Sequence, residues 1–120
     1  MNSLTQISAK EVEQIGQDML LAWQDAHGTS CGKAHVILGK DSLNVSLEDA
    51  FSPAEREVAK QEKGRQVLSD YAQQLMQPIC EQEAERVTAV LETRINNTSI
   101  QVDPVAGWIM CIFRLADPER

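Results

Sequence analysis

A chain of 120 residues, of which 42% are apolar, has the size of one globular domain with a buried core. Residues 1–120 are therefore expected to form a single domain, with a core at about 5–116. Eighteen acidic residues against eleven basic ones give a net charge of −7, which opposes nucleic acid as a partner. There is no run of about 18 apolar residues and no signal-peptide pattern, so neither membrane insertion nor secretion is expected.

The first predicted helix begins at a capping box formed by Ser8 and Glu11, in which each side chain bonds the other's backbone amide. Apolar residues at helical spacing then make one continuous face. Gly28 follows the last residue of this pattern and is expected to end the helix.

A β-hairpin is predicted next, because the apolar period changes from about 3.6 residues to about 2. In residues 34–38, Ala34, Val36 and Leu38 point one way and His35 and Ile37 the other, and in residues 43–48 apolar side chains alternate with polar ones. The turn-forming residues 39–42 separate them, so the two strands are expected to pair antiparallel.

A second helix start lies in the stretch FSPAEREVAKQEKGRQ. Ser52 is the expected N-cap, Pro53 fits the first helical position, and Glu55 completes a second capping box. We expect this short helix to end near Glu62 and to break at Gly64.

The same stretch holds the strongest local positive charge of an acidic chain. Arg56, Lys60 and Lys63 are spaced to share one helical side, and Arg65 follows the predicted break. They are either a solvated face that offsets neighbouring acids or a patch that binds an acidic partner or an anion.

A long helix is predicted over residues 66–93, with a kink at Pro78 because proline removes a backbone hydrogen bond. Unbroken, it would extend about 42 Å, so it must bend over the sheet or project beyond it. Glu81, Glu83 and Glu85 are typical of a solvated helix face. The predicted apolar face consists of Leu68, Tyr71, Leu75, Ile79, Val87, Val90 and Leu91.

A second hairpin closes the chain, with a short strand at 100–102, a turn at 103–107 and a strand from Trp108 to Leu115. This last strand is apolar on both faces, although a strand of a sheet covered on one side should alternate with polar residues. Either a second copy of the chain or the projecting end of the long helix must shield the second face. We expect a homodimer, with the interface on Trp108, Met110 and Ile112.

The predicted fold class is thus α+β, in the order α-β-β-α-α-β-β, with two antiparallel hairpins in one four-stranded sheet and a long kinked helix.

No recognisable catalytic or metal-binding motif is present. His27, Cys31 and His35 are evenly spaced but do not share one helix, and a structural zinc site needs four ligands, so no metal and no cofactor are expected. Cys31 lies in a glycine-containing loop near a lysine, which leaves open a reactive thiol in an uncharacterised enzyme.

The cysteines are odd in number and lack a C-x-x-C pair, which favours a reducing, cytoplasmic location without a disulfide framework. Cys80 and Cys111 are interpreted as small packing residues.

Residues 5–116 resemble the MpsC-like domain family, long listed as a domain of unknown function. The family's pattern has a strand, an LTPAE-like helix start, a Gly-Arg pair, a long helix, an Asp-containing turn and an apolar final strand. This chain departs from it at residues 28–33, where the family has a Gly-Arg-Gly-Pro-like turn, and near Tyr71, where the family tends to have an arginine. The matching residues, in order, are Ser52, Pro53, Ala54, Glu55, Gly64, Arg65 and Asp103.

The resemblance implies a small α+β protein without established catalytic residues, and the family name links some members to a membrane-potential or inorganic-carbon uptake system. The leading expectation is therefore a non-catalytic interaction or accessory protein with an unknown protein partner, in a membrane-associated complex. The alternatives are a small-anion or nucleotide sensor that uses Arg56, Lys60, Lys63 and Arg65, and an enzyme that uses Cys31.

Overall fold

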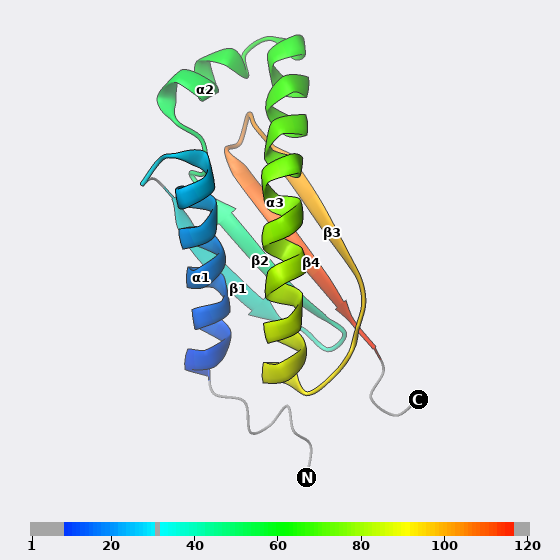
Figure 1. The fold of residues 1–120 in the computed structure, drawn as a ribbon. Helices are drawn as coiled ribbons and strands as arrows, with labels where there is room; N and C mark the ends of the chain where they lie inside the picture. Colours follow the sequence, from blue (N-terminus) through cyan, green and yellow to red (C-terminus); the bar gives the residue numbers. More distant parts are fainter. Residues whose placement is uncertain (1–8, 31, 117–120) are drawn as a thin grey trace.

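The computed structural model describes residues 9–30 and 32–116, and it has the predicted α+β fold and element order (Figure 1). The capping box expected at Ser8 and Glu11 falls partly outside the described residues. The elements are α1 (Ala9–His27), β1 (Lys33–Leu38), β2 (Ser42–Glu48), α2 (Pro53–Val58), α3 (Glu62–Leu91), β3 (Ile95–Asp103) and β4 (Trp108–Leu115).

The four strands form one antiparallel sheet in the order β1-β2-β4-β3. Each hairpin pairs within itself, and the two hairpins join through β2 and β4 at the centre. In this register Val45 of β2 and Ile100 of β3 lie on either side of Cys111 in β4. The centre of the sheet is therefore built from segments far apart in the sequence.

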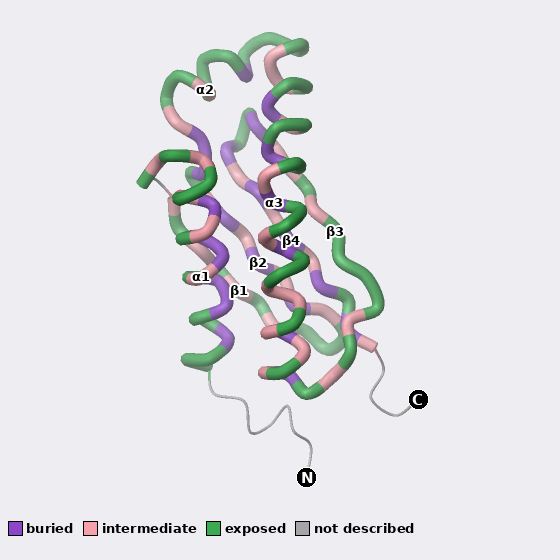
Figure 2. The backbone as a smooth tube through the Cα atoms, viewed as in Figure 1, coloured by how far each residue is buried: buried purple, intermediate pink, exposed green. Residues whose placement is uncertain are grey.

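Both long helices lie on the same face of the sheet, α1 over β1 and β2 and α3 over β3 and β4 (Figure 1). Every second residue of the central strands is buried beneath them, and the helices bury the faces that they turn toward the sheet (Figure 2). The largest fully buried side chains include Trp23, Ile15, Leu43, Ile109 and Phe113. Burial of these apolar side chains supplies the main driving force for the fold.

The opposite face of the sheet, here called the open face, is not covered by any helix of the described residues. Trp108, Met110 and Ile112 alternate with the buried residues of β4 and remain only half-buried. Ile37 of β1 lies on the same face at the sheet edge, separated from Ile112 by Asn44, and is 65% exposed. The projecting end of α3, which was the alternative cover, lies on the helical side instead.

The first helix ends where the sequence predicts. Gly28 follows His27 with a φ of +83°, and its amide donates a hydrogen bond to the carbonyl of Gln24 at 2.9 Å. Glycine adopts this left-handed conformation without the steric cost that a Cβ atom adds.

The break between α2 and α3 was predicted too late in the sequence. α2 ends at Val58, and α3 begins at Glu62, so Gly64 lies inside the first turn of α3. A Cβ atom at Gly64 would overlap the carbonyl oxygen of Val58. This glycine is therefore explained by the close approach of two helices rather than by a helix end.

The long helix continues through Pro78 for 30 residues, and the kink at this position stays a prediction. At about 1.5 Å per residue it sets the long dimension of a molecule of 51 × 25 × 20 Å. Its N-terminal turns project beyond the sheet, beside α2 (Figure 1). The buried face is also partly different from the predicted one: Tyr71 is exposed, and Ala72, Met76 and Cys80 are buried.

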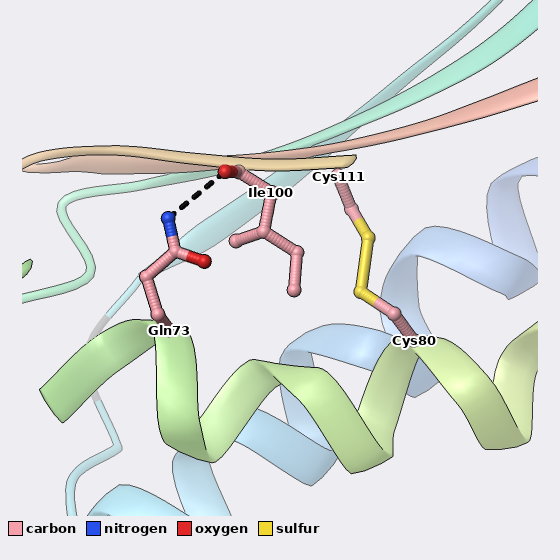
Figure 3. The surroundings of a disulfide bond; sticks show 4 residues. All are labelled: Gln73, Cys80, Ile100 and Cys111. Atoms are coloured by element: carbon pink, nitrogen blue, oxygen red, sulfur yellow. Dashed lines mark hydrogen bonds between the residues drawn. A yellow bond between two sulfur atoms is a disulfide. The ribbon is translucent and has the colours of Figure 1, made fainter. Parts of the chain in front are cut away.

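A disulfide joins Cys80 of α3 to Cys111 of β4 (Figure 3). Both the interpretation of these cysteines as simple packing residues and the expectation of no disulfide were therefore wrong. The two cysteines are 31 residues apart, and only the packing of α3 on the centre of the sheet brings them together. Nearby, the Gln73 side-chain amide donates a hydrogen bond to the carbonyl of Ile100 at 3.0 Å. The helix is thus connected to β4 covalently and to β3 by a hydrogen bond.

Candidate functional site

The start of α2 has the predicted structure. The Glu55 amide donates to the Ser52 hydroxyl oxygen at 3.3 Å, and the Ser52 amide donates to Oε1 of Glu55 at 2.8 Å. Pro53 is the first helical residue, where a missing N–H costs nothing. The capping box is therefore a structural motif, as expected from the sequence.

Glu55 also joins α2 to the end of α1, which sequence reasoning missed. Nε2 of His27 lies 2.8 Å from both carboxylate oxygens of Glu55. The His27 side chain is only 4% exposed and stacks on Trp23, with ring centroids 4.6 Å apart. Phe51 and Tyr71 lie against the same imidazole. No spacing pattern connects residues 27 and 55, so the sequence holds no signal for this pair.

The surroundings of Glu55 have opposing effects on its pKa. Burial is the largest single influence and raises the pKa, because it disfavours the charged carboxylate. The hydrogen bonds from the Ser52 amide and His27, together with the charge of His27, outweigh burial and hold the pKa below its ordinary value. The carboxylate form is therefore the one that the folded protein stabilises.

Three of the four predicted patch residues, Arg56, Lys60 and Arg65, line one surface pocket of about 420 Å³. Lys63 does not line this pocket, although the sequence spacing grouped it with the others. Val105, from the turn between β3 and β4, is part of the wall. We call this the basic pocket; Pro53, Glu57 and Ala59 complete its lining.

The open face places the predicted interface residues together. Trp108 and Met110 line a second pocket of about 220 Å³ with the acidic Glu48 and Asp49. Ile112 continues the apolar row toward Arg114 at the end of β4. The face therefore has an apolar row with acidic residues at one end and a cation at the other.

The residues weighed for metal binding do not converge. His27 is buried against Glu55, whereas Nε2 of His35 lies 3.1 Å from Glu48 on the sheet. Within residues 9–30 and 32–116, no group of three His, Cys, Asp or Glu side chains could hold a metal ion. Cys31, the basis of the enzyme alternative, lies outside the described residues.

The three acids of the long helix do not share one environment, which corrects the prediction of a single solvated face. Glu81 and Glu85 are exposed, but Glu83 is partly buried and lies 3.9 Å from Nη1 of Arg86. Burial raises the pKa of Glu83. Arg86 also forms an ion pair with Asp18 of α1, so these side chains belong to the contact between the two helices.

The fold and its surfaces define a small α+β protein with helices on one face of a four-stranded antiparallel sheet. Over residues 8–117 the chain matches the family described as Na+-translocating membrane potential-generating system (MpsC), and it belongs to that family. No curated protein and no solved structure matches the chain. In the part of the chain that the structure describes, no helix has the length and apolar character needed to cross a membrane.

Proposed function

We propose that this chain is a non-catalytic interaction protein that acts as a homodimer through the open face. The observation that carries the proposal is the apolar row Trp108, Met110 and Ile112, half-buried at the centre of a sheet face that no described helix covers. A contiguous apolar row of this kind, bordered by polar side chains, is typical of a protein interface.

The arrangement of charge favours a second copy of the same chain as the occupant. Glu48 and Asp103 lie beside Trp108, and Arg114 lies three positions along the same row of β4 side chains. A two-fold axis across the strands, between Met110 and Ile112, would place the β4 strands of two copies on each other in opposite directions. The basic end of each copy then meets the acidic end of its partner.

The same axis places apolar side chains opposite apolar ones and an arginine opposite a tryptophan ring. Met110 of one copy would face Ile112 of the other, and Arg114 would approach the Trp108 ring and the acidic pocket beside it. An arginine over a tryptophan ring is stabilised by about 0.5–2 kcal/mol, and each two-fold interface would contain this contact twice.

Membership of the MpsC family supports a role for this dimer as an accessory of a Na+-translocating membrane potential-generating system. In this proposal the helical side and the basic pocket remain available to a larger membrane-associated complex. The test is chemical cross-linking of tagged protein in native membranes, which should join it to the Na+-translocating subunit. Recovery only in the soluble fraction, with no such cross-link, would leave the dimer without this accessory role.

Self-association is tested by sedimentation of two variants with matched charge. Met110→Asp places a carboxylate in the apolar row and should give monomers, whereas Val105→Asp adds the same charge to an exposed apolar residue outside the open face. Arg114→Glu changes an exposed rim residue and should weaken dimers without disturbing the core. Equal dimer stability in all three variants and the wild type would refute this interface.

A further inference from the structure

The basic pocket is a second surface, separate from the open face. It lies between α2, the start of α3 and the β3–β4 turn. It gathers two guanidinium groups and one ammonium group in a chain of net charge −7. Glu57 also lines the pocket, so three cations face one carboxylate, and the remaining repulsion among the cations costs free energy unless a further anion accompanies them.

Arg65 is positioned by backbone carbonyls rather than by a carboxylate, and Arg56 lies beside the β3–β4 turn. Nη1 of Arg65 donates to the carbonyl of Ala59 at 3.1 Å and, more weakly, to that of Lys60 at 3.4 Å. The Arg56 guanidinium lies beside Gly107. A Cβ atom added to this glycine would lie 3.8 Å from Cζ of Arg56. The fold thus directs the Arg65 side chain, and most N–H groups of both guanidinium groups remain available for a ligand.

The nearby acids leave these arginines free to bind a ligand. In residues 9–30 and 32–116, neither Arg56 nor Arg65 forms an ion pair. The carboxylate of Asp103, in the adjacent turn, instead accepts hydrogen bonds from the amides of Val105 and Ala106 at 3.1 and 3.0 Å. Lys60 is paired with Glu57 at 3.0 Å, but both side chains are 71% exposed, and such surface pairs contribute little.

We propose that the basic pocket binds the phosphate group of a small, non-aromatic phosphate monoester. Guanidinium forks match the oxygens of a tetrahedral phosphate, and Lys60 supplies a further point charge. Pro53, Ala59 and Val105 provide an apolar wall for a compact organic group, and about 420 Å³ accommodates one. Among the residues that the structure describes, no aromatic side chain lines the pocket to stack a nucleobase, so a nucleotide is disfavoured.

The proposal does not depend on the homodimer, and it is tested by isothermal titration calorimetry with glycerol 3-phosphate, inorganic phosphate and AMP. The wild type should bind glycerol 3-phosphate saturably, and affinity should fall as salt rises. Glycerol 3-phosphate should bind more tightly than inorganic phosphate because the apolar wall contacts its organic group. The adenine base of AMP should add no affinity, so AMP should bind no more tightly than glycerol 3-phosphate. Repeating the titration on Met110→Asp separates ligand binding from self-association.

Arg56→Gln should weaken glycerol 3-phosphate binding by at least about tenfold, because it removes a charge-assisted fork. Lys63→Gln is the matched control: it removes a nearby cation that does not line the pocket, and it should retain the wild-type affinity within about twofold. Arg56→Lys keeps the charge but not the fork and should bind more weakly than the wild type. Absence of saturable binding by the wild type up to about 20 mM ligand, or equal losses in Arg56→Gln and Lys63→Gln, would overturn the proposal.

Discussion

Replacing Gly64 by alanine should destabilise the protein, although helix propensity alone predicts the reverse. Gly64 lies in the first turn of α3, where alanine is favoured over glycine by about 1 kcal/mol. Its added Cβ would overlap the carbonyl oxygen of Val58 and approach Cγ1 of the same residue to 2.7 Å. Backbone atoms cannot rotate away, so α2 and α3 must move apart.

The magnitude follows from the difference between these two effects. Overpacking of this kind costs about 1–3 kcal/mol, and for a clash with backbone we expect the upper part of that range. After subtraction of the propensity gain, Gly64→Ala should lower the free energy of unfolding by about 1–2 kcal/mol. For a domain of this size the corresponding fall in Tm is about 4–8 °C.

Thermal unfolding followed by circular dichroism measures this effect, and all variants are compared at one protein concentration because the Tm of a dimer depends on concentration. Lys63→Ala is the control, because Lys63 is exposed in the same helical turn. Val58→Ala in the Gly64→Ala background removes Cγ1 but not the carbonyl oxygen, so it should recover only part of the loss. A Gly64→Ala protein with an unchanged or higher Tm would refute the proposed steric role.

Three further predictions concern the capping box and the cysteines. Ser52→Ala should lower the free energy of unfolding by about 1 kcal/mol in urea melts, and no loss would remove the capping role. Because the folded pKa of Glu55 is lowered, its carboxylate stabilises the protein above its ordinary pKa, and that contribution is lost as the pH falls through the folded value. The stability difference between wild type and Glu55→Gln should therefore be largest near neutral pH and shrink in acid; a pH-independent difference would contradict this. With Cys80 and Cys111 joined, unfolded protein should offer one reactive thiol before reduction and three afterwards, and three at both stages would contradict the disulfide.

Much of the fold could be predicted because its signals are local. Alternation identified the first hairpin, and the residues Ser52, Pro53 and Glu55 identified the start of α2. The second hairpin was recognised from its turn and its apolar last strand, but β3 (Ile95–Asp103) is longer than the predicted strand at 100–102. Gly64 was misread because a helix-ending glycine and a glycine at a close helix contact look identical in sequence. The shifted buried face of α3 has a related cause, since the sheet beneath it decides which side of a long helix is covered.

The candidate sites were only partly predictable because they depend on contacts between distant segments. Arg56, Lys60 and Arg65 were found through their charge, but the sequence could not show that Val105 completes their pocket or that Lys63 lies outside it. The contact between His27 and Glu55 and the disulfide likewise join elements that meet only after α1 and α3 pack on the sheet.

Sedimentation equilibrium of the wild-type protein at tens of micromolar tests the central claim, self-association through the open face, most directly. The wild type should have the mass of two chains and Met110→Asp the mass of one chain, with the circular dichroism of a folded protein in both. A wild-type mass near that of one chain at this concentration would contradict the account, because Trp108, Met110 and Ile112 would then face solvent in the isolated molecule.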